Sequence, residues 1–220
     1  MRRSSHQTPA DRLTLRCRVS LAAAVVAAFL VAGTARPASA ARFEFPANEK
    51  SNSIQFVSRA PAETVTGKTN QLSGHVVLDP SAVGDSIEIS IDVPLTTLDT
   101  GMALRNQHMR ENHLETDKFP TATFRGAHVV KGAGTVLAAG QTQSVEIEGE
   151  FQVHGVTKTI HVPVELTWTP ASGDKHESLR SVARFDVKLS EYDIKRPQFL
   201  VMKLDEVQHV TFDVTAYAAP

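Results

Sequence analysis

The segment from Arg105 to His113 holds the side chains best suited to polar chemistry. It contains two arginines and two histidines, Arg105, His108, Arg110 and His113. A guanidinium group presents paired N–H donors that match two oxygens of a phosphate. These four residues are therefore candidate contacts for a polar or anionic group. The alternative is a solvated loop that buries only its Met and Leu side chains.

The histidines of the chain do not form a metal-binding pattern. His108 and His113 lie five apart, and His154 and His161 fall on opposite arms of one expected hairpin. Neither pair has a convincing third ligand or a usual zinc spacing. The chain also lacks the G-x-S-x-G nucleophile motif and a phosphate-binding Gly-rich loop. We expect no metal site, no catalytic residues and no enzyme activity.

The first 40 residues have the features of a cleaved signal peptide. Arginines precede an uncharged run from Val19 to Ala35, and Ala38-Ser39-Ala40 gives the small-x-small pattern of a cleavage site. The densest apolar part, Val19 to Ala32, is shorter than the ~20 residues of a membrane span. We predict cleavage after Ala40, export by the Sec route to the periplasm, and a mature domain of residues 41–220 without a membrane anchor.

Removal of this leader changes the charge and the thiol chemistry. It takes six Arg and one Asp from the chain's 23 basic and 24 acidic residues, which leaves a net charge near −6. Nucleic-acid binding depends on clustered Lys and Arg, so this balance argues against nucleic acid as a partner. The only cysteine, Cys17, leaves with the leader, so the mature domain forms no disulfide.

Most of the remaining chain alternates between apolar and polar residues, a pattern typical of β-strands. The clearest example is a hairpin from Gly149 to Trp168, with a turn at His154-Gly155-Val156-Thr157. The other expected strands are Phe43–Phe45, Ile54–Phe56, Thr64–Leu78, Ser86–Leu95, Thr121–Val130, Leu179–Leu189 and Val207–Tyr217.

About eight strands joined by turns predict an antiparallel sandwich or a closed barrel. The segment Leu98–Pro120 contains spaced helix formers and predicts a short helix over one end of the sheet. The Gly- and Ala-rich segment Lys131–Gln143 predicts an exposed hairpin tip. An eight-stranded barrel is filled by side chains or holds one slender ligand, and the pattern alone leaves both open.

The hairpin GEFQVHGVTKTIHVPV, Gly149 to Val164, resembles the signature hairpin of the YceI-like family. Further matches follow in order at 95–100, 110–114, 119–124 and 185–194, so the resemblance covers residues 42–217. It implies an all-β fold, an extended eight-stranded antiparallel lipocalin-like β-barrel with a short helical insertion. It also implies export to the periplasm and a lumen that holds a polyisoprenoid lipid. Many members carry Asp-Phe-Phe where this chain has Glu115-Thr116-Asp117, which predicts a differently shaped cap.

In such a barrel the inward strand positions become the expected ligand-binding set. A lipid tail needs a long apolar tunnel, and burial of ~20 carbons at ~0.8 kcal/mol each gives ~16 kcal/mol before association costs. Ordinary core packing is the alternative for each residue. A pyrophosphate or quinone head group would meet Arg105, His108, Arg110 and His113 at the barrel mouth. The expected lumen residues are Phe56, Ile87, Ile89, Ile91, Phe124, Phe151, Val153, Val162, Val164, Phe185, Val187 and Phe212.

We therefore expect a carrier for a polyprenyl phosphate or an isoprenoid quinone, with the lipid as ligand and no other cofactor. A fatty-acid or fatty-amide binder would need a narrower and shorter lumen, and a structural or stress protein would have a filled core. An enzyme acting on such lipids would need polar side chains that converge inside the lumen, and the inward sets show none. An open mouth would expose apolar surface, which favours a homodimer, but the sequence places no interface.

Overall fold

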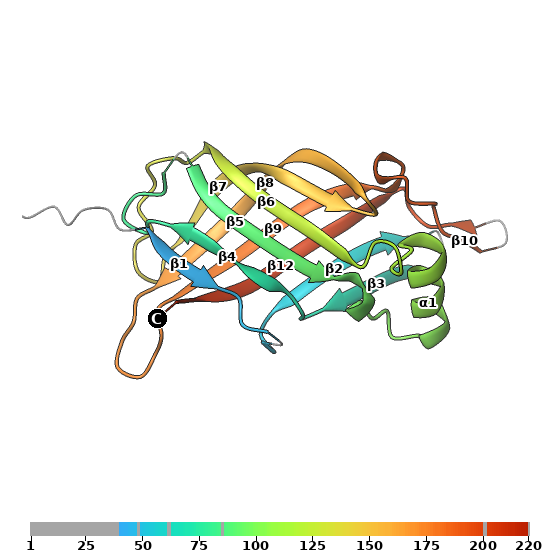
Figure 1. Ribbon diagram of the computed structural model, residues 1–220, viewed down its shortest axis with the longest axis horizontal. Helices are drawn as coiled ribbons and strands as arrows, with labels where there is room; N and C mark the ends of the chain where they lie inside the picture. The colour runs from blue at the N-terminus through green and yellow to red at the C-terminus, as the bar shows by residue number, and fades with distance from the viewer. Residues whose placement is uncertain (1–39, 48, 61–62, 85, 200–201, 220) are drawn as a thin grey trace, which may run out of the picture. The chain divides into compact units, whose positions relative to one another are not determined.

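The computed structural model describes residues 40–219, apart from 48, 61–62, 85 and 200–201. The predicted leader and Cys17 lie outside the described residues, except for Ala40. Within the described part, none of the helices has the length and hydropathy needed to cross a membrane. The described part is a closed antiparallel β-barrel with one short helix (Figure 1).

The barrel wall is eight strands wide. β1 and β2 together occupy one of these positions, beside β12, and β3 and β4 together occupy the next. β12 pairs with β2 along its first half and with β1 at its end, where Phe43 lies opposite Ala218 and closes the barrel. The sheet order is β1-β4-β5-β6-β7-β8-β9-β12-β2-β3. The strands are β1 (Ala41–Glu44), β2 (Ser53–Arg59), β3 (Thr64–Thr69), β4 (Ser73–Leu78), β5 (Ser86–Pro94), β6 (Thr121–Lys131), β7 (Thr142–Val153), β8 (Val156–Thr169), β9 (Ser178–Lys188) and β12 (Val207–Ala218).

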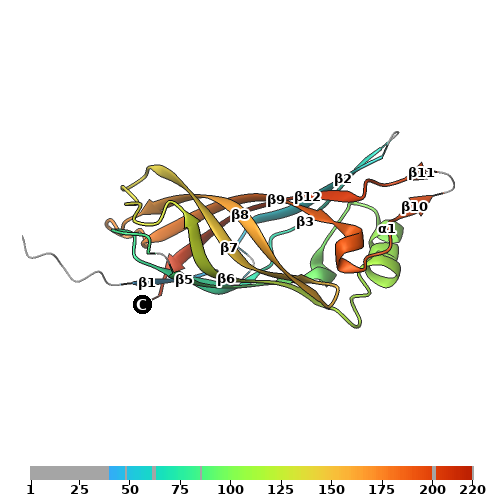
Figure 2. The same ribbon diagram turned by 90° about the horizontal axis from the view of Figure 1, so that it is seen from above.

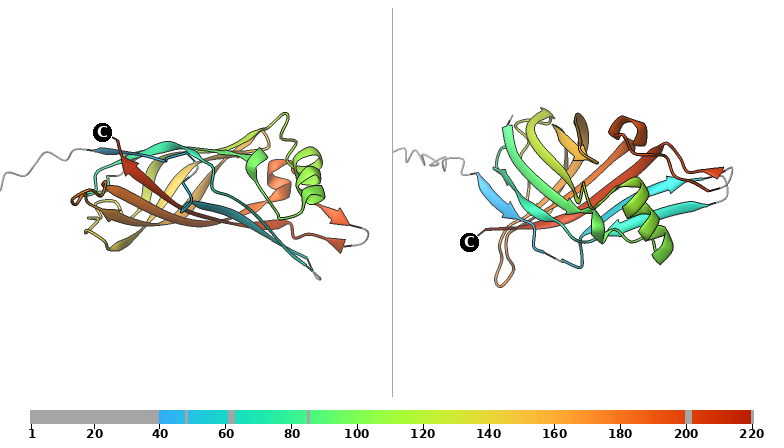
Figure 3. Two further views of the ribbon diagram at one scale, coloured as in Figure 1. Left: turned by 90° about the horizontal axis from the view of Figure 1, so that it is seen from below. Right: turned by 45° about the vertical axis from the view of Figure 1, so that its right-hand side comes forward.

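A cap covers one end of the barrel. The helix α1 (Ala103–His108) continues into a π-helical turn, η2 (Met109–His113), as the sequence pattern of this segment predicted. Figures 1 and 2 show α1 at the same end as a small hairpin of β10 (Gln198–Phe199) and β11 (Met202–Lys203), which the sequence did not predict. Two 3-10 turns, η1 (Leu95–Thr97) and η3 (Leu189–Tyr192), complete this end. The C-terminus lies at the opposite end (Figure 3).

The opposite end is closed by packed side chains, and here the expectation of an exposed tip at 131–143 is wrong in part. Leu137 is almost fully buried, and its backbone N–H donates to the carbonyl of Pro80 at 2.8 Å. Val83 is also fully buried and exchanges backbone hydrogen bonds with Gly134 and Thr135. The tip folds over the barrel end because its backbone finds hydrogen-bond partners in the β4–β5 loop and Leu137 finds apolar cover.

The turn between β7 and β8 is tight and strained. Both turn residues have positive φ, 53° at His154 and 77° at Gly155, as a two-residue hairpin turn of this hand requires. The His154 ring lies 4.7 Å from the Phe119 ring, and its nitrogens contact the Tyr192 carbonyl and the Glu115 carboxylate. These contacts fix the turn to the cap and explain why a histidine is held at a φ that glycine normally takes.

Candidate functional site

The barrel contains a cavity of about 670 Å³, and members of two core clusters line it. One cluster, around Phe43 and Leu137, fills the end that carries the C-terminus. The other, around Met109 and Tyr192, lies beneath the cap. At roughly 30 Å³ for each water-sized group, a cavity of this size has room for about 20 carbon atoms.

All twelve residues that the sequence assigned to the lumen line this cavity. They come from seven strands, because alternation in each strand places every second side chain on the inner face. Their contact with a ligand stays a prediction. The sequence analysis missed lining residues from the cap and from strand ends, including Leu98, Met102, Leu104, Met109 and Leu204.

Two glycines let aromatic rings lie flat against the inner wall. Gly67 lies opposite Phe56 in the β2–β3 ladder, and a Cβ built on Gly67 would fall 2.2 Å from the Phe56 ring. A Cβ on Gly149 would likewise fall 2.5 Å from the ring of Phe124. The missing side chains leave space at the wall for these rings, and this keeps the centre of the lumen open.

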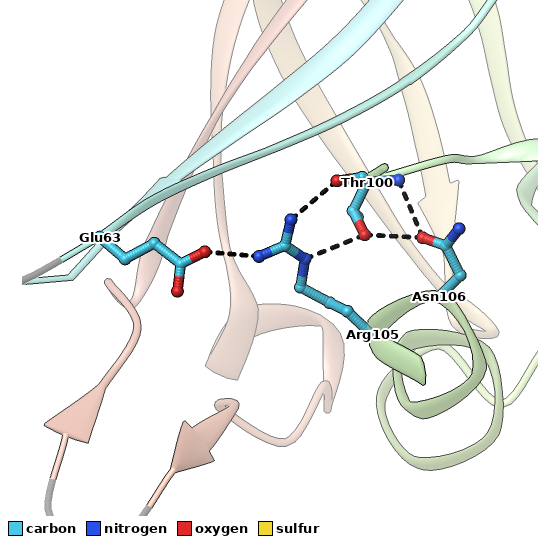
Figure 4. Close-up of polar contacts among 4 residues, drawn as sticks. All are labelled: Glu63, Thr100, Arg105 and Asn106. Atoms are coloured by element: carbon cyan, nitrogen blue, oxygen red, sulfur yellow. Dashed lines mark hydrogen bonds and ion pairs between the residues drawn. The ribbon is translucent and has the colours of Figure 1, made fainter. Parts of the chain in front are cut away.

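The charged residues of the cavity lie at its capped end and neutralise each other. Among the described lining residues, Glu63 carries the only carboxylate, and Arg105 carries the only guanidinium or ammonium group. Arg105 Nη1 donates to Glu63 Oε1 at 2.5 Å, so this ion pair joins α1 to the β2–β3 turn (Figure 4). Arg105 also donates to Thr100, through Nε to the hydroxyl at 3.0 Å and through Nη2 to the carbonyl at 2.7 Å. All three nitrogens of its guanidinium group therefore donate hydrogen bonds.

Asn106 fixes the loop that receives Arg105. Its Oδ1 accepts from both the backbone N–H and the hydroxyl of Thr100, at 2.8 and 2.7 Å (Figure 4). Its amide nitrogen donates to Asp99 Oδ1 at 2.7 Å, and this hydrogen bond lowers the pKa of Asp99 below its ordinary value. The network holds the start of α1 over the cavity without a side-chain N-cap.

The other three residues of the predicted head-group set have different surroundings. His108 and His113 line the cavity, whereas Arg110 does not. Arg110 Nη2 donates to the Leu98 carbonyl at 3.2 Å. His113 Nδ1 lies 3.0 Å from the Lys195 carbonyl, and burial lowers the pKa of His113 below 6.5, which favours a neutral ring at neutral pH. The structure thus brings three of the four residues to the cavity.

Several neutral polar side chains line the cavity, and two of them, Ser181 and Gln208, occupy inward strand positions that the apolar pattern did not indicate. Ser181 and Gln208 are both buried and both line the cavity. Gln208 Nε2 donates to the Asp205 carbonyl at 2.8 Å. Both could have been found from the sequence, because Ser181 alternates in step with Ala183 and Gln208 with Val210. The expectation of a lumen without polar side chains is therefore wrong at these two positions.

No group of three or more His, Cys, Asp and Glu side chains within the described residues is arranged to hold a metal ion. His161 is the most carboxylate-rich histidine, with Glu148 at 3.1 Å and Glu146 at 3.4 Å on the outer face of the barrel. Both are contacts between partly exposed surface side chains. The absence of a metal and of enzyme activity in the protein stays a prediction.

Comparison with known proteins decides the family. The sequence model of the YceI-like domain matches residues 45–216. The chain belongs to the YceI-like family. Among curated YceI-like relatives, a UPF0312 protein of Vibrio parahaemolyticus is 29% identical over 145 residues, which cover 64% of this chain and 71% of that protein. A UPF0312 protein of Vibrio vulnificus is 31% identical over 117 residues, 52% of this chain and 57% of that protein.

Solved structures share the YceI-like fold at low sequence identity. A polyisoprenoid-binding domain from Saccharophagus degradans, implicated in plant cell wall breakdown, superposes with a TM-score of 0.62 at 19% identity and covers 82% of this chain and 100% of that one. BcnA of Burkholderia cenocepacia gives 0.59 at 15% identity, with 78% and 99% covered. At these identities the likeness establishes the barrel and not the ligand.

Proposed function

We propose that this protein binds the apolar tail of a single isoprenoid lipid inside its barrel and acts as a periplasmic carrier or store for it. The observation that carries the proposal is the predominantly apolar cavity of about 670 Å³, whose wall includes residues of both core clusters. Burial of about 20 carbons at ~0.8 kcal/mol each supplies affinity without a specific polar contact. The polyisoprenoid-binding domain from Saccharophagus degradans, which has the same fold, supports this class of ligand.

The capped end favours an uncharged head group. Arg105 is the one lining cation among the described residues, and Glu63 already neutralises it at 2.5 Å. A phosphate placed beside Arg105 would also face the Glu63 carboxylate, and like charges repel. The histidines that line the cavity near the cap, His108 and His113, suit a carbonyl or hydroxyl better. We therefore favour an isoprenoid quinone over a polyprenyl phosphate.

A fatty-acid or fatty-amide ligand is the second candidate, and the size of the cavity favours it equally. A tail of about 20 carbons corresponds to four isoprenoid units or to one long fatty chain. The bare carboxylate of a fatty acid meets the same objection as a phosphate. An amide does not, so a fatty amide is the stronger form of this alternative.

Periplasmic location belongs to the proposal as well. It rests on the leader features of residues 1–40, of which only Ala40 lies among the described residues. Peptide sequencing of the N-terminus of protein recovered from a periplasmic extract would test it. A sequence that starts at Ala41 is the expected result, and an intact leader in the cytoplasmic fraction would contradict it.

Native mass spectrometry of the purified protein, with lipid analysis of its organic extract, tests the ligand. We expect one extra mass per chain that matches an isoprenoid lipid with a neutral head. A fatty amide would support the second candidate, and a polyprenyl phosphate would refute the head-group argument alone. A protein that carries no lipid and takes up none when a prenyl quinone is added would refute lipid binding.

A further inference from the structure

The barrel wall has a gap between β8 and β9. Their ladder runs from Thr169–Ser178 to Val164–Ala183 and ends there. Both strands continue well beyond this point, β8 back to Val156 and β9 on to Lys188. In this described part of the chain β8 then pairs with β7 alone and β9 with β12 alone. Two strand edges therefore face each other without hydrogen bonds between them.

The sequence explains why the ladder ends at this point. The next residue of β8 is Pro163, which has no backbone N–H to donate and is confined to edges of a sheet. Beyond it the inward residues of β8 lose burial, since Val162 is buried whereas Ile160 and Val156 are only partly so. A side chain in an intact wall would keep its cover, so the loss of burial follows the gap.

The gap is a bounded window and not a frayed end. On the side of the cap, His154 contacts the Tyr192 carbonyl at 3.1 Å, and Lys158 pairs with Glu191 at 3.4 Å. These contacts join the start of β8 to η3, which follows β9. The window thus spans about five residues of each strand, roughly 16 Å at the rise of a β-strand.

A groove of about 610 Å³ lies outside this window. Its lining includes the polar residues His161, Asp186 and His209, and His209 Nδ1 lies 2.7 Å from Asp186 Oδ1. Its floor is formed by apolar residues that belong to the inner face of the barrel, Ile160, Phe185 and Val210. Phe185 and Val210 line both this groove and the lumen.

We propose that this window is a lateral portal through which an apolar chain enters and leaves the lumen, with Phe185 as its gate. Phe185 separates the two spaces, and its ring packs edge-on against Phe151 at 5.5 Å between centroids. A rotation of this one side chain about χ1 would connect the groove to the lumen without unfolding a strand. The cap, held by the Arg105 network, would then not have to open. The inference rests on the proposed lipid binding and adds the route.

Stopped-flow fluorescence with the uncharged methyl ester of cis-parinaric acid as the probe tests the gate. Phe185→Ala should raise the association rate constant by about tenfold, because a gate limits entry, and should raise the dissociation rate constant at least as much, because the variant also loses a side chain that lines the lumen. Phe212→Ala is the matched control, since Phe212 lines the lumen and not the groove. It should weaken binding mainly through a faster dissociation. An association rate constant that Phe185→Ala leaves unchanged would overturn the gate.

A blocking experiment tests the route independently of Phe185. In a Cys17→Ser background, a bulky maleimide polymer is attached at His161→Cys, beside the window, or at Glu165→Cys, on the same outer face of β8 beside the intact ladder. Attachment at residue 161 should slow probe uptake at least about tenfold, and attachment at residue 165 should not. Uptake that neither label alters would overturn the portal while lipid binding stands. A wild-type protein that takes up no probe would refute the proposed function and the portal with it.

Discussion

The arrangement of Gly67 and Phe56 allows a clean test of whether the lumen is a ligand site. In Gly67→Ala the new methyl group would lie 2.2 Å from Phe56 Cε1 and 2.5 Å from Cζ, and its three nearest atoms all belong to this ring. The φ of Gly67 is not positive, so alanine fits the backbone. The contact must lengthen to about 3.5 Å, and we expect the ring to swing about 1.3 Å away from the wall into the lumen.

The expected cost falls on binding and not on folding. A ring displaced by this distance, together with the added methyl, excludes about two carbon groups of a bound tail. At ~0.8 kcal/mol for each buried methylene this is about 1.6 kcal/mol, or roughly fifteenfold in Kd. The melting temperature of the apo protein should change by less than about 5 °C. Alanine has a lower conformational entropy than glycine in the unfolded chain, and this offsets part of the cost of displacing the ring.

Fluorescence titration with the uncharged methyl ester of cis-parinaric acid measures the effect, and a second variant isolates its cause. Phe56→Leu in the Gly67→Ala background removes the displaced ring and should restore most of the lost affinity. A Kd of Gly67→Ala equal to that of the wild type would refute the view that tails occupy the lumen beside Phe56. Weak binding that Phe56→Leu does not rescue would show that the ring is not responsible.

Three further predictions concern lumen volume, pH and the β7–β8 turn. Ala183→Leu adds about 90 Å³ of side chain to the lumen wall. If the lumen is open, this change should raise the melting temperature of the apo protein and weaken the binding of long tails. If the core is filled, the same change should destabilise the fold by about 1–3 kcal/mol. Burial lowers the pKa of His113 below 6.5 in the folded protein, so the unfolded chain takes up a proton at a higher pH and the stability of the fold decreases as the pH falls through that range. Between about pH 7.5 and about pH 5, thermal melts of His113→Asn should therefore show a smaller decrease in melting temperature than those of the wild type. Gly155→Ala should lower the free energy of unfolding, measured by chemical denaturation, by about 1–3 kcal/mol, because φ at this residue is 77° and Phe119 lies 2.6 Å from the new methyl group. Gly173→Ala is the control: φ is 57° there but the space around it is open, so the free energy of unfolding should fall less.

The sequence was most informative where strand alternation decides the outcome. In a strand, every second side chain must face the same way, so the inner face of the hairpin 149–168 follows from the first apolar residue. For the same reason all twelve predicted lumen positions line the cavity. Ser181 and Gln208 obey this rule too and were missed only because the analysis followed apolar residues.

Features that depend on contacts distant in sequence could not be predicted. Arg105 was a candidate for a free head-group contact, and its partner Glu63 lies 42 residues earlier in the chain. No local pattern links the two. The burial of Leu137 likewise needs the loop that follows β4, and the end of the β8–β9 ladder needs the register of both strands. Pro163 was a visible signal of an edge, but without the register it could not show which neighbour was lost.

The apolar wall of the lumen predicts that a bound tail stabilises the fold. Along the inner face of β9 from Leu179 to Leu189, Ser181 is the only polar residue, and a water molecule needs two or more polar partners, so water solvates this part of the wall poorly. A tail placed against it removes apolar surface from water, and a ligand that binds only the folded state raises stability by mass action. We therefore expect that extraction of bound lipid lowers the melting temperature and that a neutral prenyl lipid restores it. A melting temperature that neither step changes would contradict lipid binding.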